Sequence, residues 1–208
     1  MHVPDAEATT STACSVSQDI LSAPPNAGTT PNSPNSTTVS CISDNRLRVC
    51  GIVDGTTVDG PGLRTSIYFA GCRHHCPGCH NPSTWDFNAG TELSAEYLME
   101  RIADNGFAVT FTGGDPMYSA TALLPLAKRI CNAGLNLWIY TGFTIEEIFS
   151  AGGDMAALAD MADVIVDGPF IESLKDTRLL FRGSSNQRLV DMTATKKNGH
   201  VVEYTPTF

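Results

Sequence analysis

Hydrophobic residues between positions 63 and 166 follow two alternating periods. Short apolar runs rich in β-branched and aromatic residues predict buried strands at 63–70, 107–112, 135–140 and 164–166. Between them, apolar residues recur at helical spacing, which predicts helices at 92–105, 120–133, 144–150 and 155–161. Thr91 or Ser94 is the candidate N-cap of the first helix.

Strand and helix therefore alternate along the folded part of the chain, which predicts an α/β fold with parallel strands and helical crossovers. Ligands of such sheets bind outside the carboxyl ends of the strands. The folded part has about 160 residues, whereas eight βα units typically need ~250. We therefore expect a partial, open TIM-like barrel, whose mouth suits a large substrate.

The first 45 residues differ in composition from the rest. They are crowded with Ser, Thr, Pro, Asn and Ala, contain no Lys or Arg, and carry only four acidic side chains: Asp5, Glu7, Asp19 and Asp44. Such a segment cannot bury enough apolar surface to fold. The sequence thus predicts a disordered, low-complexity tail over 1–45 and one domain over 46–208.

Charge and hydropathy exclude several classes of partner. The formal net charge is -9 and the pI about 4.8, so no basic surface for nucleic acid is expected. No apolar run is long enough to span a membrane. Residues 1–45 resemble neither a secretory signal nor a transit peptide, so we expect a cytoplasmic protein.

Three cysteines directly follow the first predicted strand. Cys72, Cys76 and Cys79 have the spacing C-x3-C-x2-C. Three thiolates on one short loop can hold three irons of a 4Fe-4S cubane and leave the fourth iron open. An open coordination position is where a substrate or cofactor can bind metal directly, as in catalytic zinc sites.

A structural zinc site is the main alternative for these cysteines, with His74, His75 or His80 as a fourth ligand. No second Cys or His pair follows at the spacing typical of such sites, which favours the cluster. The odd number of cysteines also argues against a disulfide framework. The remaining cysteines have no ligand spacing, so a second cluster is not expected: Cys14, Cys41, Cys50 and Cys131.

A second polar motif follows the next predicted strand. Gly113 and Gly114 allow a ligand to approach the backbone closely, and the Asp115 carboxylate can accept hydrogen bonds from an ammonium group. By itself GGDP is typical of a plain turn. Because it ends the strand beside the one that carries the cysteine loop, the two motifs should face each other.

Six blocks in this order resemble the radical S-adenosylmethionine enzymes, and within them the activating proteins of glycyl-radical enzymes. The blocks are VDGPGLR, GCRHHCPGCHNPSTW, FTGGDPM, WIYTGF, DVIVDGPF and RGSSNQR. The resemblance runs from about Val53 to about Leu189 and is greatest to the branch that acts on the anaerobic (class III) ribonucleoside-triphosphate reductase. It implies an oxidoreductase with the partial barrel of this superfamily.

The resemblance also implies roles for individual residues. Cys72, Cys76 and Cys79 would bind the 4Fe-4S cluster, and S-adenosylmethionine would chelate its open iron. The methionine ammonium would contact Gly113, Gly114 and Asp115, where GGD replaces the commoner GGE. Cofactor contacts are also implied for Gly78, Cys79 and His80, with Gly78 where many relatives have an aromatic residue. No catalytic side chain beyond the cluster and the cofactor is implied.

The implied reaction is reductive cleavage of S-adenosylmethionine, after which the 5'-deoxyadenosyl radical takes a hydrogen atom from one glycine of the reductase. Flavodoxin or ferredoxin would supply the electron. Alternatives are an activase of another glycyl-radical enzyme such as pyruvate formate-lyase, a small-molecule radical enzyme such as a deazaguanine synthase, and a non-enzymatic zinc-binding module. Residues 80–112 contain no cysteine, so an inserted ferredoxin-like cluster domain is absent there.

The other polar motifs allow both a binding and a structural interpretation. Arg64 and Asp167 fit a ligand contact or an ion pair at the barrel rim equally well. The segment 182–187 is dense in hydrogen-bond donors, which favours a binding role somewhat. Thr141, Gly142 and Gly168 follow predicted strands, while Trp85 and Trp138 are expected in the core.

Overall fold

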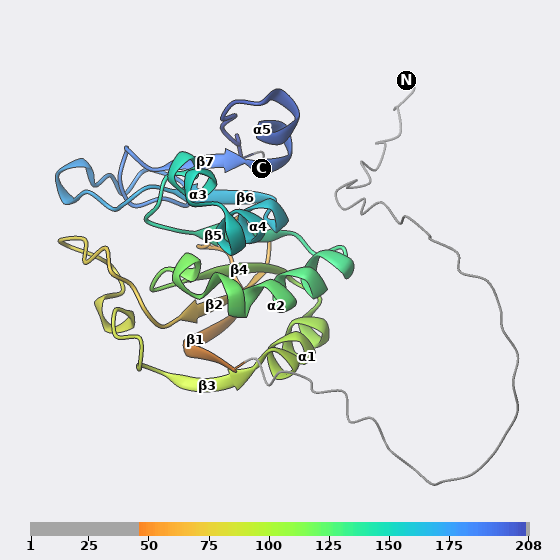
Figure 1. Cartoon of the computed structure of the whole chain (residues 1–208). Coiled ribbons are helices and arrows are strands. Elements are labelled where there is room, and N and C mark those ends of the chain that lie inside the picture. The colour runs from red at the N-terminus through yellow and green to blue at the C-terminus, as the bar shows by residue number, and fades with distance from the viewer. Residues whose placement is uncertain (1–45, 207–208) are drawn as a thin grey trace, which may run out of the picture. The chain divides into compact units, whose positions relative to one another are not determined.

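A seven-stranded mixed sheet forms the centre of the fold (Figure 1). The computed structural model describes residues 46–206, and the predicted disorder of 1–45 lies outside them. The strands are β1 (Arg46–Thr56), β2 (Arg64–Phe69), β3 (Thr91–Ser94), β4 (Ala108–Gly113), β5 (Leu137–Tyr140), β6 (Val164–Asp167) and β7 (Arg188–Asp191). Their order in the sheet is β3-β1-β2-β4-β5-β6-β7.

The four central strands, β2, β4, β5 and β6, are parallel to one another, as the alternating pattern predicted. Their register places one apolar residue of each strand in a row across the sheet: Ile67, Phe111, Ile139 and Ile165. The sheet does not close, since β3 and β7 lie at its opposite ends. The predicted α/β class with an open, partial barrel is therefore confirmed.

The outer strands correct the expectation of alternation throughout. β1 pairs antiparallel with β2 and β3, and β7 pairs antiparallel with β6. The sequence interpretation missed all three outer strands. β3 is only four residues long and includes Thr91 and Glu92, which are exposed, so it lacks the apolar run by which a strand is recognised.

The helices are α1 (Ala95–Asn105), α2 (Ala120–Asn132), α3 (Ile145–Ala151), α4 (Gly153–Met161) and α5 (Met192–Asn198). The first four lie where the sequence predicted them, except that residues 92–94 belong to β3. Ser94 is the N-cap of α1, and its hydroxyl accepts a hydrogen bond from the Tyr97 N–H. Thr144 and Glu147 form a capping box that begins α3.

Alternate residues of each strand point to opposite faces of the sheet, and both faces are covered. On one face, the row that includes Phe111 and Ile139 packs with buried residues of α1, α2 and α4, which lie on one side of the sheet in Figure 1. On the other face, Trp138 packs with Val166 and Leu189. Trp138 is thus a core residue as predicted, whereas Trp85 is only partly buried.

Arg64, the first residue of β2, lies beside Trp138 on this second face, and its side chain is fully buried. Its guanidinium donates to the backbone oxygens of Pro61 and Val109 and to the Asn136 amide oxygen. All of these partners are uncharged, so Arg64 forms no rim ion pair. Burial lowers its pKa to about 10.

No helix of residues 46–206 is both long enough and apolar enough to cross a bilayer. The longest of them, α2, has 13 residues, whereas a spanning helix needs about 20.

Candidate functional site

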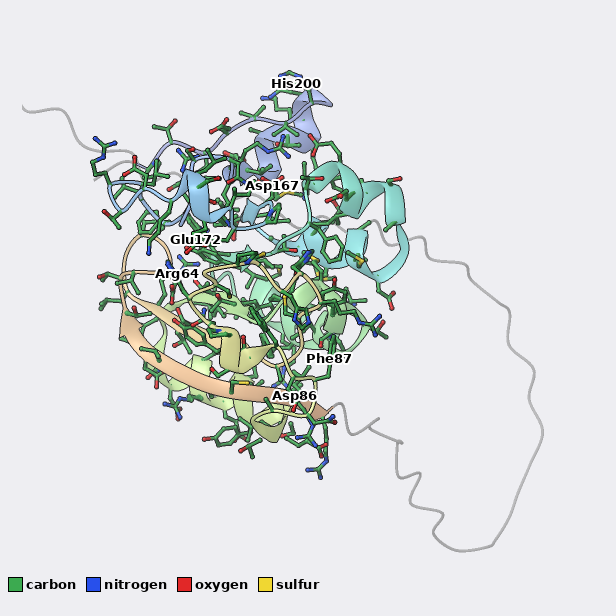
Figure 2. All side chains as sticks on the ribbon, turned by 90° about the vertical axis from the view of Figure 1, so that its left-hand side faces the viewer. Arg64, Asp86, Phe87, Asp167, Glu172 and His200 are labelled. Atoms are coloured by element: carbon green, nitrogen blue, oxygen red, sulfur yellow. The ribbon has the colours of Figure 1, made fainter. Side chains whose placement is uncertain are left out.

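The polar motifs meet at the edge of the sheet where the parallel strands end. Two long loops leave this edge: residues 70–90 after β2 and residues 168–187 after β6. Figure 2 looks onto it, with Phe87 of the first loop below Glu172 of the second. Between the loops and the strand ends lies a cavity of about 200 Å³. We call it the cysteine cavity, because its lining includes Cys72, Cys76 and Cys79.

The three cysteine thiols are positioned by backbone groups. Burial raises the pKa of the Cys72 thiol, while the N–H groups of His74 and His75 act in the opposite direction. Burial also raises the pKa of the Cys76 thiol, which the Phe170 N–H opposes. The Asn81 N–H donates to Cys79 Sγ over 3.4 Å. Backbone N–H groups aimed at cysteine sulfurs are among the features that tune iron-sulfur clusters.

This donor set fits a 4Fe-4S cluster better than a single ion. Within residues 46–206, no three Cys, His, Asp or Glu side chains converge closely enough to chelate one metal ion. Thiolates that bind three different irons of a cubane must stand farther apart than thiolates on one ion. Cys72, Cys76 and Cys79 all line one cavity, and no fourth cysteine is among the residues that line it.

The glycines of GGDP share a cavity with the cysteines, as expected from their position after the neighbouring strand. Gly113 and Gly114 both line the cysteine cavity. A Cβ at Gly114 would lie 2.5 Å from the Gly71 backbone oxygen, and one at Gly113 would lie 2.5 Å from the Phe69 nitrogen. Two strand ends therefore meet backbone to backbone, which only glycine allows here.

Asp115 is oriented differently from its glycine neighbours. Its side chain is 1% exposed, and among the described residues it is not part of the cavity lining. Its carboxylate instead accepts four hydrogen bonds from protein groups: His74 Nε2, Thr141 Oγ1, Gly142 N and Met117 N. The carboxylate thus lies behind the cavity wall that Gly113 and Gly114 form.

Gly78 and His80 flank Cys79 on the cysteine loop. His80 lines the cysteine cavity, and its ring centroid lies 5.4 Å from that of Phe170. Gly78 is exposed, has a φ of 72° and lies outside the lining. A Cβ there would lie 2.9 Å from Glu172 Cδ, so the glycine lets the loop after β6 approach the cysteine loop.

A second cavity of about 320 Å³ adjoins the first and shares His80, Tyr140 and Gly183 with it. Asp59 lines both cavities and accepts a hydrogen bond from the Tyr68 hydroxyl over 2.9 Å. The second cavity is further lined by Val58, Leu179, Phe181 and Arg182. Val58 is 69% exposed, so this cavity opens toward solvent.

The weaker sequence candidates divide into two groups. Residues that line the cysteine cavity are Thr141, Gly142, Gly168, Gly183 and Gln187. Asp167 is buried, and its carboxylate accepts hydrogen bonds from the Arg188 guanidinium and the Ile145 N–H, so its contacts are structural. The Asn186 amide donates to the Pro169 oxygen, and the Ser184 hydroxyl accepts from the Ile171 N–H. Much of the 182–187 segment therefore organises its own loop.

Sequence reasoning missed five residues of the cysteine cavity: Asn81, Thr112, Tyr140, Phe170 and, except as a possible zinc ligand, His74. Tyr140 and Phe170 look like ordinary apolar residues at strand ends. A signal for them did exist, since each stands within two residues of a glycine that follows a strand. For His74 the sequence offers no comparable signal, because its partner Asp115 lies 41 positions away.

Comparisons with known proteins show the family of this chain. The family model described as a 4Fe-4S single cluster domain matches residues 58–190. The chain is 38% identical over 141 residues to the anaerobic ribonucleoside-triphosphate reductase-activating protein of Salmonella typhimurium, covering 62% of this chain and 89% of that protein. The chain belongs to the family of anaerobic ribonucleoside-triphosphate reductase-activating proteins.

Other members of this activating-protein family match over similar lengths. The Escherichia coli K12 protein of the same name is 36% identical over 141 residues, covering 62% of this chain and 89% of its own. The protein of the same name from enterobacteria phage T4 is 33% identical, and the match covers 64% of this chain and 86% of the phage protein. The solved structure of QueE from Escherichia coli has a TM-score of 0.43 and 20% identity, covering 51% of this chain and 58% of that one. The family resemblance inferred from the six motifs is confirmed.

Proposed function

We propose that this chain is a radical S-adenosylmethionine activase that generates a glycyl radical on the anaerobic ribonucleoside-triphosphate reductase. One observation carries the proposal: Cys72, Cys76 and Cys79 share one cavity with Gly113 and Gly114, in a chain of the activating-protein family. That cavity offers sulfur donors together with the backbone of two glycines. These are the features that a cluster-bound cofactor needs.

In this proposal Cys72, Cys76 and Cys79 hold three irons of a 4Fe-4S cluster. The backbone of Gly113 and Gly114 contacts the amino acid part of S-adenosylmethionine, and His80, Gly78 and Cys79 lie on the side of its nucleoside. When bound, the cluster would supply the electron for reductive cleavage of S-adenosylmethionine, and the cofactor would supply the hydrogen-abstracting group that acts on a glycine of the reductase. The protein needs no general base for this step.

The chain's own residues position the reactants and exclude water. Tyr140 and Phe170 are aromatic groups on the wall of the cysteine cavity, next to the glycines at the strand ends. The second cavity adjoins it at Asp59 and His80 and opens toward solvent at Val58. We propose that the glycine-bearing segment of the reductase enters through this second cavity.

Two further proposals concern the surroundings of the reaction. We propose flavodoxin or ferredoxin as the electron donor, as the family resemblance implies. We propose the cytoplasm as the compartment, since the thiols of Cys72, Cys76 and Cys79 would have to remain reduced to take up iron.

Anaerobic reconstitution tests the proposal directly. The purified chain is supplied with iron and sulfide, reduced, and incubated with S-adenosylmethionine and the anaerobic reductase. We expect a brown protein, release of 5'-deoxyadenosine and a glycyl doublet in the electron paramagnetic resonance spectrum of the reductase. Colourless protein that binds stoichiometric zinc would support a binding module instead. Cleavage of the cofactor without a doublet would support the radical chemistry but would reject this reductase as the partner.

A further inference from the structure

The Asp115 carboxylate joins three segments that are distant in the sequence. Oδ2 accepts from His74 Nε2 at 2.8 Å, from Thr141 Oγ1 at 3.0 Å and from the Gly142 N–H at 2.9 Å. Oδ1 accepts from the Met117 N–H at 3.0 Å. His74 belongs to the cysteine loop, while Thr141 and Gly142 follow β5. We call these four contacts the Asp115 network.

Both carboxylate oxygens of Asp115 accept hydrogen bonds within this network. An ionised carboxylate only accepts hydrogen bonds, so Nε2 of His74 carries the hydrogen in this contact. The Thr141 hydroxyl donates to Asp115 and accepts from the Phe143 N–H over 3.1 Å, so both of its roles are filled as well. Hydrogen bonds to a buried charged group are the stronger ones in proteins.

The His74 ring is held by packing as well as by its hydrogen bond. Its centroid lies 4.6 Å from that of Phe143, edge to face, and 5.7 Å from that of Tyr118. A Cβ at Gly142 would lie 2.5 Å from His74 Cδ2, so the glycine makes room for the ring. His74 thus connects the loop of the three cysteines to the end of β5.

We infer that Asp115 is a positioning residue, which acts on the cofactor through His74 and Gly142 and not by direct contact. By fixing the cysteine loop against the ends of β4 and β5, it sets the spacing between the cluster and the backbone of Gly113 and Gly114. This inference rests on the proposed function and changes one role within it. The ammonium group then contacts backbone atoms, while the carboxylate stays behind the wall.

Amide hydrogen exchange of the metal-free chain tests the mechanical part of the inference. His74→Phe keeps an aromatic ring against Phe143 and Tyr118 but removes the N–H donor. We expect exchange at residues 141–143 to become faster by roughly tenfold, the equivalent of one hydrogen bond to a charged group. His74→Gln, which places an N–H donor at the end of the side chain, should restore most of the protection.

His75→Phe is the matched control for this experiment. His75 lies on the same loop and its ring packs on Trp85 at 4.7 Å, outside the Asp115 network. We expect its exchange pattern at 141–143 to equal that of the unmodified chain. Equal exchange in His74→Phe and the unmodified chain would overturn the inference, because His74 would then not hold the end of β5.

A double-mutant cycle distinguishes positioning from direct contact. The affinity for S-adenosylmethionine is measured in reconstituted chains carrying Asp115→Asn, His74→Phe, both or neither, with iron content as a check on the cluster. If Asp115 acts through His74, Asp115→Asn should cost about tenfold in affinity alone and clearly less in the His74→Phe background. An equal loss in both backgrounds would overturn the positioning role through His74.

The two experiments can fail separately. If the unmodified chain binds neither cluster nor cofactor, the proposed function fails, while hydrogen exchange in the metal-free chain still decides whether the Asp115 network connects the loops. If the chain binds both but the cycle is additive, only the positioning role is lost. His74→Gln provides a folded comparison if His74→Phe proves unstable.

Discussion

Arg64 Nε donates a hydrogen bond to Thr110 Oγ1 over 2.6 Å. The same hydroxyl donates to the Asp59 backbone oxygen over 2.9 Å, so one threonine connects a buried guanidinium to the loop between β1 and β2. The guanidinium also lies 5.3 Å from the centroid of the Trp138 ring. Arg64 lines neither cavity. Through Thr110 it nevertheless positions Asp59, which lines both cavities.

Thr110→Val should destabilise the protein, because it leaves a buried Arg64 N–H and the Asp59 oxygen without this partner. We expect a loss of about 1–3 kcal/mol in the free energy of unfolding, measured by chemical denaturation. Thr91→Val is the control, since Thr91 is exposed and should change stability by less than about 0.5 kcal/mol. Equal stability of both variants would mean that water replaces the threonine.

Cys76→Ala should abolish cluster assembly, because two remaining thiolates cannot hold three irons. Iron and sulfide content and visible absorption after anaerobic reconstitution give the measurement. Cys50→Ala is the matched control, as Cys50 is exposed and does not line the cysteine cavity. A Cys76→Ala chain with a full complement of iron and normal release of 5'-deoxyadenosine would refute the ligand assignment.

Gly142→Ala should destabilise the protein through contact with His74. The added methyl group must displace a packed ring, which typically costs about 1–3 kcal/mol. Combining it with His74→Ala should recover part of that loss, and chemical denaturation of all four chains measures the coupling. Gly51→Ala is the control, because a Cβ added there would meet no atom within 4 Å and its φ is ordinary. Simple additivity of the two changes would contradict the proposed contact.

Because of Asp163, the free energy of unfolding should decrease as the pH rises above 3.8. Burial raises the pKa of its carboxyl, which also accepts a hydrogen bond from the Leu137 N–H. Between the unfolded value of 3.8 and the raised value, the folded chain binds more protons than the unfolded chain, so a rise in pH favours unfolding. Asp163→Asn should lose this dependence in denaturation curves recorded across that window.

Glu146 provides a comparison of opposite sign. The Arg188 guanidinium lowers the pKa of its carboxyl below 4.5, so its stabilising effect is present above 4.5 and is lost as pH falls through the lowered value. The Glu146→Gln chain should therefore match the unmodified chain only at the lowest pH. The same pH slope for both substitutions would contradict at least one of these directions.

The central strands and four helices could be predicted because each carries its own period. Ile67, Phe111 and Ile139 lie in apolar runs, and Ser94 and Thr144 are typical helix caps. The outer strands could not be predicted in this way. β3, for example, is short and polar and becomes a strand only through pairing with β1.

The site residues also fall into those that the sequence reveals and those that only the structure reveals. Cys72, Cys76 and Cys79 are recognisable because their spacing is local. The link from His74 to Asp115 is not, since it depends on how two loops fold against each other. Asp115 stands out in the sequence as a polar residue at a strand end, but its burial and its partners become visible only in three dimensions.

The absence of space beside Gly113 and Gly114 restricts how this chamber can be remodeled. Any side chain there would collide with the backbone of Phe69 or Gly71, so the floor of the chamber cannot be resized by substitution. By contrast, the long segment 168–187 meets Gly78 of the cysteine loop through the side chain of Glu172, which can move. Randomised libraries that aim to admit a different target protein should therefore concentrate on that segment and leave the strand ends untouched.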